Sequence, residues 1–211
     1  MTNEPAADCQ LCPRLAGMRA DNRRAHPGWF NAPVPSFGDR TARLLIIGLA
    51  PGLQGANRTG RPFTGDYAGV LLYGALAAHG FAQGNYAAHA ADGLRLQDCR
   101  ITNAVRCVPP QNKPENSEII NCRNYLEAEI RSMPHVVAFL ALGKIAHDSA
   151  ARALGLRLTR APFAHDARHE LPDGRLLFDS YHCSRYNTNT GRLTPAMFDA
   201  VFRNIRQHLG P

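Results

Sequence analysis

Four short apolar segments, each followed by a stretch with helical or loop character, constrain the fold of this chain most. They are RLLIIG at 43–48, CRITNAV at 99–105, HVVAFLALG at 135–143 and LLFDSYHCS at 176–184. Apolar runs of this length are typical of buried strands. Strands that alternate with helices form a parallel sheet covered by helices on both faces. We therefore predict a three-layer α/β/α sandwich around a central, mostly parallel sheet of four strands.

The segments between these strands supply the helices. Helical apolar spacing predicts helices over 69–80, 116–133 and 143–155, and Thr194-Pro195 is a good start for a last helix ending near 210. Residues 1–40 carry five prolines and are expected to be irregular. A chain of 211 residues can form one well-buried α/β domain, so we predict a single domain over 1–211.

The charge balance favours an anionic partner. Lys and Arg number 24 against 17 Asp and Glu, a net charge of +7, and only two of the basic residues are lysines. Arginine suits bidentate phosphate contacts, although a high-GC coding bias would also favour it. No apolar run approaches the roughly 20 residues that span a bilayer, and the first residues do not resemble a signal peptide. We expect a cytoplasmic, nucleoid-associated protein without a membrane partner.

The longest polar loop, GLAPGLQGANRTGRPFTGD at 48–66, directly follows the first strand. Ligands of open α/β sheets bind at the carboxyl ends of strands, on loops that the sheet positions. The loops 49–66, 103–113 and 182–192 should converge at that edge. They predict a binding site there, with no nucleotide cofactor.

Cysteine spacing points to a metal centre. Cys9 and Cys12 form a CxxC pair, and Cys107 and Cys122 follow far downstream with fourteen residues between them. Disulfides are rare in a reducing compartment, so four thiolates could hold zinc or an iron–sulfur cluster. Four unligated buried cysteines are the alternative. Cys99 and Cys183 are left over, and we expect neither to be a nucleophile.

Three motifs resemble the signature loops of the uracil-DNA glycosylase superfamily. They are GLAPGLQGANRTGRPFTGD, TNAVRCVPPQNKP and YHCSRYNTNTGRLT, and they fall in the expected order along nearly the whole chain. Ala50 stands where other families carry an acid or amide, which is the pattern of family 5, the type B enzymes. Cys183 departs from the usual proline of the last motif. The cysteine set resembles the structural 4Fe–4S ligation shared by families 4 and 5.

The resemblance implies a monofunctional glycosylase. Such an enzyme would act as a monomer on single- or double-stranded DNA with a damaged base, in base excision repair. It would flip out uracil, and also hydroxymethyluracil, ethenocytosine or hypoxanthine, and hydrolyse the glycosidic bond to leave an abasic site. The alternative from another class is a non-catalytic iron–sulfur sensor of DNA damage or redox state. A family 4-like enzyme lacks support because the glutamate of its first motif is missing.

The resemblance also implies roles for single residues. Phe63 would stack on the flipped base, or else simply anchor its loop in the core. Asn103 would read the base edge, or else cap its own strand. His182 would stabilise the negative charge on the departing base, or else be a satisfied strand-end histidine. Asp66 would hold the water or face the sugar, and it could also cap the next helix; Asn57 would be a weaker helper.

The remaining implied roles concern the pocket floor and the DNA backbone. The small residues of the first loop let the backbone approach the base closely, and they are Gly48, Ala50 and Gly52. The loop RYNTNTGR resembles a wedge that enters the minor groove. The expected DNA contacts are Arg58, Arg61, Arg185, Tyr186, Asn187 and Arg192.

Overall fold

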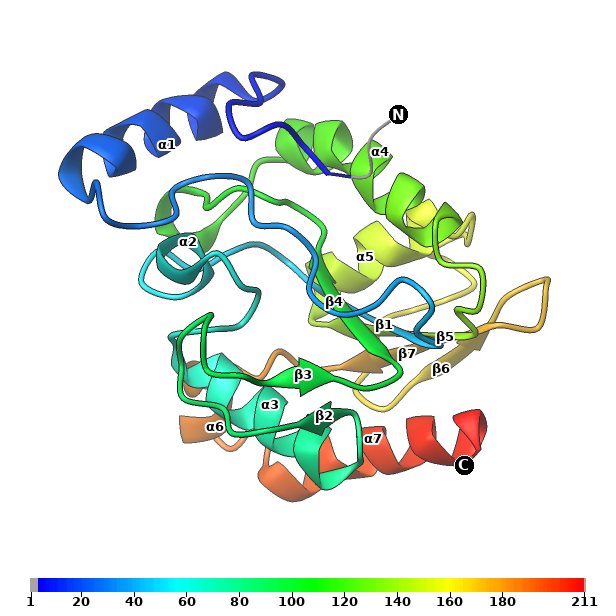
Figure 1. Cartoon of the computed structure of the whole chain (residues 1–211). Coiled ribbons are helices and arrows are strands. Elements are labelled where there is room, and N and C mark those ends of the chain that lie inside the picture. The colour runs from blue at the N-terminus through cyan, green and yellow to red at the C-terminus, as the bar shows by residue number, and fades with distance from the viewer. Residues whose placement is uncertain (1–3, 211) are drawn as a thin grey trace.

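A five-stranded sheet forms the centre of the computed structural model, which describes residues 4–210 (Figure 1). Its spatial order is β4-β1-β5-β7-β6, with parallel pairing throughout except at the edge strand β6. The strands are β1 (Leu44–Gly48), β4 (Cys99–Asn103), β5 (Ala138–Leu142), β6 (Arg168–Glu170) and β7 (Leu176–Ser180). The four predicted strands are confirmed, but the expected strand count of four is wrong. The fifth strand, RHE, is short and polar and carries no apolar signal.

Helices cover both faces of the sheet, as the three-layer prediction requires. On one face lie α3 (Tyr67–Ala78) and α7 (Pro195–Leu209), and on the other lie α4 (Asn116–Arg131) and α5 (Lys144–Ala153) (Figure 1). Caps define where these helices begin. The Asp66 side chain accepts from the Gly69 amide at the start of α3, and Thr194 does the same for Met197 at the start of α7.

Alternation along β1 divides the interior into two cores. Leu44 and Ile46 face α3 and α7, whereas Leu45 and Ile47 face α4 and α5. All four side chains are fully buried. Because successive side chains of a strand point to opposite faces, one apolar run supplies both cores. The rigid sheet then holds its carboxyl-end loops in place.

The expectation of an irregular stretch over 1–40 is wrong for part of it, because α1 (Pro13–Ala25) lies there. Proline is tolerated at the first position of a helix, so Pro13 starts the helix rather than preventing it. Few of its side chains are buried, so no apolar stripe marked it. The remaining elements are short: α2 (Ala56–Thr59), β2 (Ala82–Gln83), β3 (Arg95–Leu96), a 3-10 turn at Pro110–Asn112 and α6 (Arg185–Asn189).

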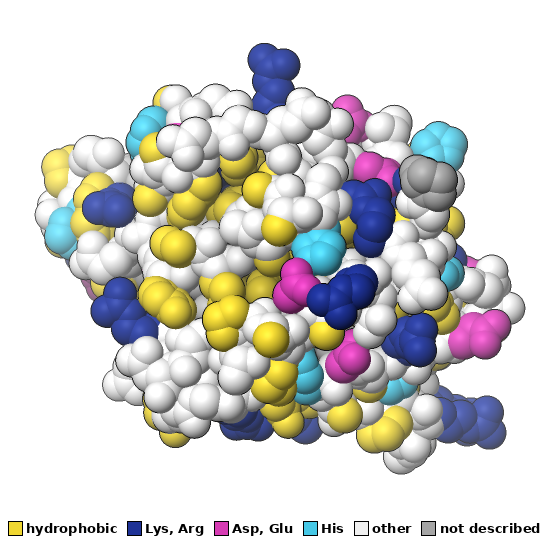
Figure 2. All heavy atoms as spheres, turned by 90° about the horizontal axis from the view of Figure 1, so that it is seen from below, with side chains coloured by type: hydrophobic (Ala, Val, Ile, Leu, Met, Phe, Trp, Pro, Cys, Tyr) yellow, Lys and Arg dark blue, Asp and Glu magenta, His cyan; other side chains and the backbone are white. Residues whose placement is uncertain are grey.

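Figure 2 views the molecule from the side of α3 and α7, where apolar side chains are exposed among charged ones. A shallow groove between these helices is lined mainly by Val70, Leu71, Ala75 and Pro195. Across residues 4–210, none of the helices combines the length and the apolar character that crossing a bilayer requires.

Candidate active site

The three loops predicted to converge do meet, and they enclose a cavity of about 450 Å³ at the carboxyl end of the sheet. This lies within the range of small-molecule sites. Its walls carry both the expected residues and others. The lining comprises Leu49, Ala50, Pro51, Gly52, Ala56, Phe63, Asp66, Tyr67, Ala68, Asn103, Asn112, His182, Ser184 and Arg185.

Phe63 lies in this wall with an unusual backbone conformation. Its φ is +51°, a left-handed value that is uncommon for a bulky residue and costs about 1–3 kcal/mol. The ring packs directly over the backbone of Gly48, where an added Cβ would lie 2.7 Å from the ring edge. The side chain is buried, lies in the core and lines the cavity at once. Anchoring the loop and facing the cavity are therefore compatible.

Asn103 ends β4 beside the same glycine. The residue is 2 % exposed, and its side-chain oxygen is buried without a hydrogen-bond partner in the described part of the chain. A Cβ on Gly48 would overlap this oxygen. An unpaired buried acceptor is destabilising, so its presence in a cavity wall indicates a ligand that completes it. Asn103 does not cap its own strand through this atom.

His182 follows β7, and its ring faces the cavity beside Phe63. The two ring centroids are 6.0 Å apart and the planes meet at 29°. The side-chain amide of Asn187 donates to the His182 carbonyl at 2.8 Å, which ties His182 to the start of α6. Burial lowers the pKa of His182, and the nearby charge of Asp66 only partly opposes this. The imidazole is therefore neutral at pH 7.

Cys183, the neighbour of His182, points away from the cavity. Its thiol is fully buried and lies 3.6 Å from the carbonyl of Ala68. Burial raises the pKa of this thiol to about 12, so it stays protonated and unreactive. The expectation that Cys183 is no nucleophile agrees with this placement.

Asp66 caps a helix and also lines the cavity. One carboxylate oxygen accepts from the Gly69 amide at 3.2 Å and caps α3. The other lies against the backbone of Gly52 and Gly55, where a Cβ on Gly52 would approach it to 3.2 Å. Because the residue also lines the cavity, this second oxygen is available to a bound molecule.

Three residues predicted for the site make hydrogen bonds within the protein instead. Asn57 is buried, does not line the cavity and donates to the Asn31 side chain at 3.0 Å, so it is no direct helper. Arg61 is 4 % exposed and forms a double hydrogen bond to Asp92, so the expected phosphate contact is wrong. Asn187 is half-buried and holds the His182 carbonyl instead of projecting outward.

The other expected DNA contacts are exposed near the cavity. Arg58, Arg185, Tyr186 and Arg192 all lie on the surface, and Tyr186 is 72 % exposed. The expected loop RYNTNTGR contains the short helix α6, which the Ser184 side chain caps by accepting from the Asn187 amide. Arg185 of this turn lines the cavity, and its neighbour in sequence, Tyr186, is exposed to solvent.

Some lining residues carried no sequence signal. Tyr67 stands at the first turn of α3, with the Arg185 guanidinium 5.3 Å above its ring. Asn112 reaches the cavity from the 3-10 turn, where its φ of +57° follows a positive φ at Gln111. A pair of polar residues in a proline-rich loop does not mark itself as part of a site. In the structure, the positive φ values of Gln111 and Asn112 set this turn apart from the rest of its loop.

The four cysteines of the predicted metal centre line one small pocket between α1 and α4, together with Arg19 and Tyr125. Backbone and side-chain N–H groups point at their sulfurs. Arg19 donates to Cys107 Sγ at 3.5 Å, and the Arg106 amide donates to Cys122 Sγ at 3.4 Å. Burial raises the pKa of Cys107 to about 11 and that of Cys122 to about 12. The four thiols of the predicted metal centre therefore lie around one small pocket, with N–H donors directed at the sulfurs of Cys107 and Cys122.

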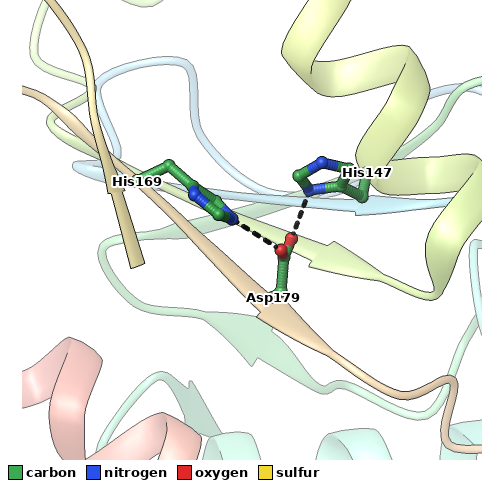
Figure 3. Close-up of side chains that lie close together, drawn as sticks. All are labelled: His147, His169 and Asp179. Atoms are coloured by element: carbon green, nitrogen blue, oxygen red, sulfur yellow. Dashed lines mark hydrogen bonds and ion pairs between the residues drawn. The ribbon is translucent and has the colours of Figure 1, made fainter. Parts of the chain in front are cut away.

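A second group of possible ligands lies away from the cavity. His147 of α5 and His169 of β6 both contact the fully buried carboxylate of Asp179 on β7 (Figure 3). The nitrogen–oxygen distances are 2.7 and 2.9 Å, and the second ring nitrogen of His147 lies 2.8 Å from the Ala161 carbonyl. Ligands on one tetrahedral ion, about 2.0–2.2 Å from it, would stand farther apart. The group is a hydrogen-bonded anchor between α5 and the sheet.

The fold and cavity define a class of α/β protein with a cavity of small-molecule size at the carboxyl end of a parallel sheet. Comparison with known proteins narrows the class. The family model of the uracil DNA glycosylase superfamily matches residues 35–206. The type-5 uracil-DNA glycosylase of Thermus thermophilus is 45% identical over 207 residues, covering 96% of this chain and 94% of the relative.

Two further uracil-DNA glycosylases match this chain, one over most of its length and one over about half. The type-5 enzyme of Mycobacterium tuberculosis is 44% identical over 211 residues, covering 96% of this chain and 78% of the relative. A type-4 uracil-DNA glycosylase of Saccharolobus solfataricus is 37% identical, but over only 51% of this chain and 44% of the relative. The chain therefore belongs to the uracil-DNA glycosylase superfamily, in its type-5 branch, and is a DNA glycosylase that hydrolyses N-glycosyl bonds.

Proposed function

We propose that this protein excises uracil from DNA and leaves an abasic site, as a monomer acting in base excision repair. The observation that carries the proposal is the unpartnered, buried oxygen of Asn103 in the wall of a cavity that also contains Phe63 and His182. A carboxamide can accept from N3–H of uracil and donate to O4. It therefore discriminates against cytosine, whose hydrogen-bonding edge is different.

Breaking the glycosidic bond separates charge, and the cavity is arranged around that separation. The bond between the sugar carbon and the base nitrogen breaks, the sugar becomes cationic and the base leaves as an anion. Neutral His182 donates a hydrogen bond to O2 of the departing base. The free oxygen of Asp66 faces the sugar, orients the water that adds to it and accepts the proton that this water loses, and the base anion takes up a proton from solvent after it leaves. Phe63 stacks on the base before and during departure.

The proposed substrate range is broad because the floor of the cavity lacks a polar group at Ala50. A larger or differently substituted base meets a methyl group there and loses no hydrogen bond. We extend the proposal to hydroxymethyluracil, ethenocytosine and hypoxanthine. The exposed Arg58, Arg185 and Arg192 would contact phosphates, and Tyr186 would fill the space left by the flipped base.

A 4Fe–4S cluster is proposed at Cys9, Cys12, Cys107 and Cys122. Such a group cross-links the segments that carry its ligands. Ala50, in the cavity floor, packs on the apolar side chains around these cysteines, so the cluster would support the first loop from behind. The structure assigns it no chemical step.

The proposal is tested by incubating the purified protein with a labelled duplex that contains one uracil, followed by alkaline cleavage. Strand breaks at the uracil position, together with free uracil in solution, are the expected result. The variant His182→Asn should lower the single-turnover rate constant at least about 100-fold. Binding of the duplex without release of base would overturn the proposal and would favour a damage-binding protein.

A further inference from the structure

The segment 61–65, which carries Phe63 into the cavity wall, is fixed from one side by tyrosine hydroxyls. The Tyr86 hydroxyl lies 3.3 Å from the Phe63 carbonyl and accepts from the Gly65 amide at 3.2 Å. The Tyr73 hydroxyl donates to the Pro62 carbonyl at 2.7 Å. Both peptide groups that flank Phe63 are therefore engaged by side chains.

The contact between Tyr86 and Phe63 requires a glycine at position 69. Gly69 of α3 lies under the contact, and a Cβ there would overlap both the Phe63 carbonyl and the Tyr86 hydroxyl. The Tyr86 ring stacks on the Tyr73 ring with centroids 4.7 Å apart. The glycine, the two rings and the strained residue thus form one packed unit below the cavity.

An ion pair attaches this unit to the β2–β3 hairpin. Arg61 forms 2.7 Å hydrogen bonds from both terminal nitrogens to the two oxygens of Asp92, and its third donor reaches Thr64 at 2.8 Å. Asp92 also accepts from the amides of Ala87 and Leu94 at 3.0 Å. The guanidinium lies 5.3 Å from the Tyr73 ring centre and 5.8 Å from that of Tyr86. A desolvated, fully hydrogen-bonded pair of this kind fixes geometry.

We propose that Tyr86, supported by the Arg61–Asp92 pair, is a positioning residue that holds Phe63 in its left-handed conformation against the base. The inference rests on the proposed function, because it assigns a purpose to the ring of Phe63. A bulky residue persists at positive φ only where its surroundings over-determine it. Here the surroundings are a hairpin that contributes no residue to the cavity lining.

The decisive experiment is a double-mutant cycle between Tyr86→Phe and Phe63→Ala, read as single-turnover excision of uracil at saturating enzyme. Tyr86→Phe keeps the ring stack and removes the hydroxyl. It should lower the rate constant about tenfold while duplex affinity changes little. In the Phe63→Ala background the same change should have no further effect on the rate, since there is no ring left to position.

A matched pair of substitutions separates positioning from general stability. Arg61→Lys keeps the charge but loses the double hydrogen bond, and it should lower the excision rate. Arg43→Lys weakens an Arg–Asp pair at the amino end of β1, where Arg43 contacts Asp98 at 2.7 Å. It should lower the melting temperature without changing the rate constant.

A second readout does not depend on activity. Tyr86→Phe should speed amide hydrogen exchange in segment 63–66, with α4 and α5 unaffected. If the effects of Tyr86→Phe and Phe63→Ala on rate are additive, or if exchange in 63–66 does not change, the inference is wrong. If the wild-type protein releases no uracil, the proposed function fails, and the exchange measurement alone still decides whether Tyr86 holds the loop.

Discussion

Phe63 and His182 come from loops more than a hundred residues apart, yet their rings lie 6.0 Å from centre to centre in the wall of one cavity. The two planes are inclined by 29°. One ring arrives on a strained turn after β1 and the other directly after β7, and β5 lies between these two strands in the sheet. The parallel sheet brings them together because its strands end at the same edge.

Replacing Gly48 by alanine should damage the site without unfolding the protein. The added methyl would overlap Asn103 and press on the Phe63 ring, so both groups must shift. We expect the excision rate constant to fall at least about tenfold, since small misplacements in a site have large effects. Gly74→Ala is the control. A Cβ at Gly74, inside α3, meets no atom within 4 Å, and that variant should keep full activity and be as stable or slightly more stable.

Asn103→Ala should remove the group that reads the base edge. The expected result is a loss of about 100-fold or more in uracil excision under single-turnover conditions, with duplex affinity nearly unchanged. The loss should be smaller for ethenocytosine, which offers a different edge. Equal losses on both substrates would show that Asn103 acts on the fold of the loop and not on the base.

The acid limb of the activity profile should report His182. Burial lowers its pKa, so the neutral donor persists as pH falls from 7 through the ordinary histidine range near 6.5, and activity should decline only at lower pH. Asp66 opposes this shift, because its charge favours the protonated ring. Asp66→Asn should therefore move the acid limb to still lower pH, whatever it does to the plateau. A limb that moves to higher pH would contradict the electrostatic assignment.

Removing one proposed cluster ligand should remove the cluster. Cys107→Ser should abolish the visible absorbance of an iron–sulfur centre and reduce bound iron and sulfide, and the melting temperature should drop. Cys99→Ala is the control, because Cys99 is a buried core residue remote from the four-cysteine pocket. It should retain full iron content. Equal iron in both variants, or none in the wild type, would refute the cofactor proposal.

Stability should depend on the buried pair of His147 and Asp179. Burial disfavours the charged imidazole, but the hydrogen bond and charge of Asp179 outweigh it, so the pKa of His147 is raised. The facing groups are His169 on β6, Asp148 on α5 and the Ala161 carbonyl. A raised pKa contributes stability that is fully present below the unfolded value near 6.5 and is lost as pH rises through the folded value.

Urea unfolding across that pH range checks this assignment. The wild-type free energy of unfolding should decrease as pH rises above about 6.5. Asp179→Asn should lower it by about 3 kcal/mol in mildly acidic solution and flatten its pH dependence. If the difference in unfolding free energy between the wild type and Asp179→Asn does not shrink as pH rises, His147 is neutral in the folded protein.

Much of the fold could be predicted from the local sequence, because the spacing of apolar residues differs between strands and helices. The continuous apolar run LLII predicted a buried strand, and Asp66 and Thr194 marked helix starts correctly. The helix α1 and the edge strand β6 were not predicted, since neither carries an apolar stripe. Their places are set by contacts to distant parts of the chain, such as the ion pair between Arg14 and Glu118.

For the site, the sequence by itself determined which loops meet, because consecutive parallel strands end at one edge. It also determined the residue types that meet there: an aromatic ring, a carboxamide, an imidazole and a carboxylate. Only the tertiary structure decided which hydrogen-bond partners the polar side chains of these loops have. It turned Arg61 inward onto Asp92, bonded Asn57 to Asn31, and left the Asn103 oxygen without a partner. The reason is physical: hydrogen-bond partners are chosen by proximity in space, and residues 61 and 92 become neighbours only after the chain has folded.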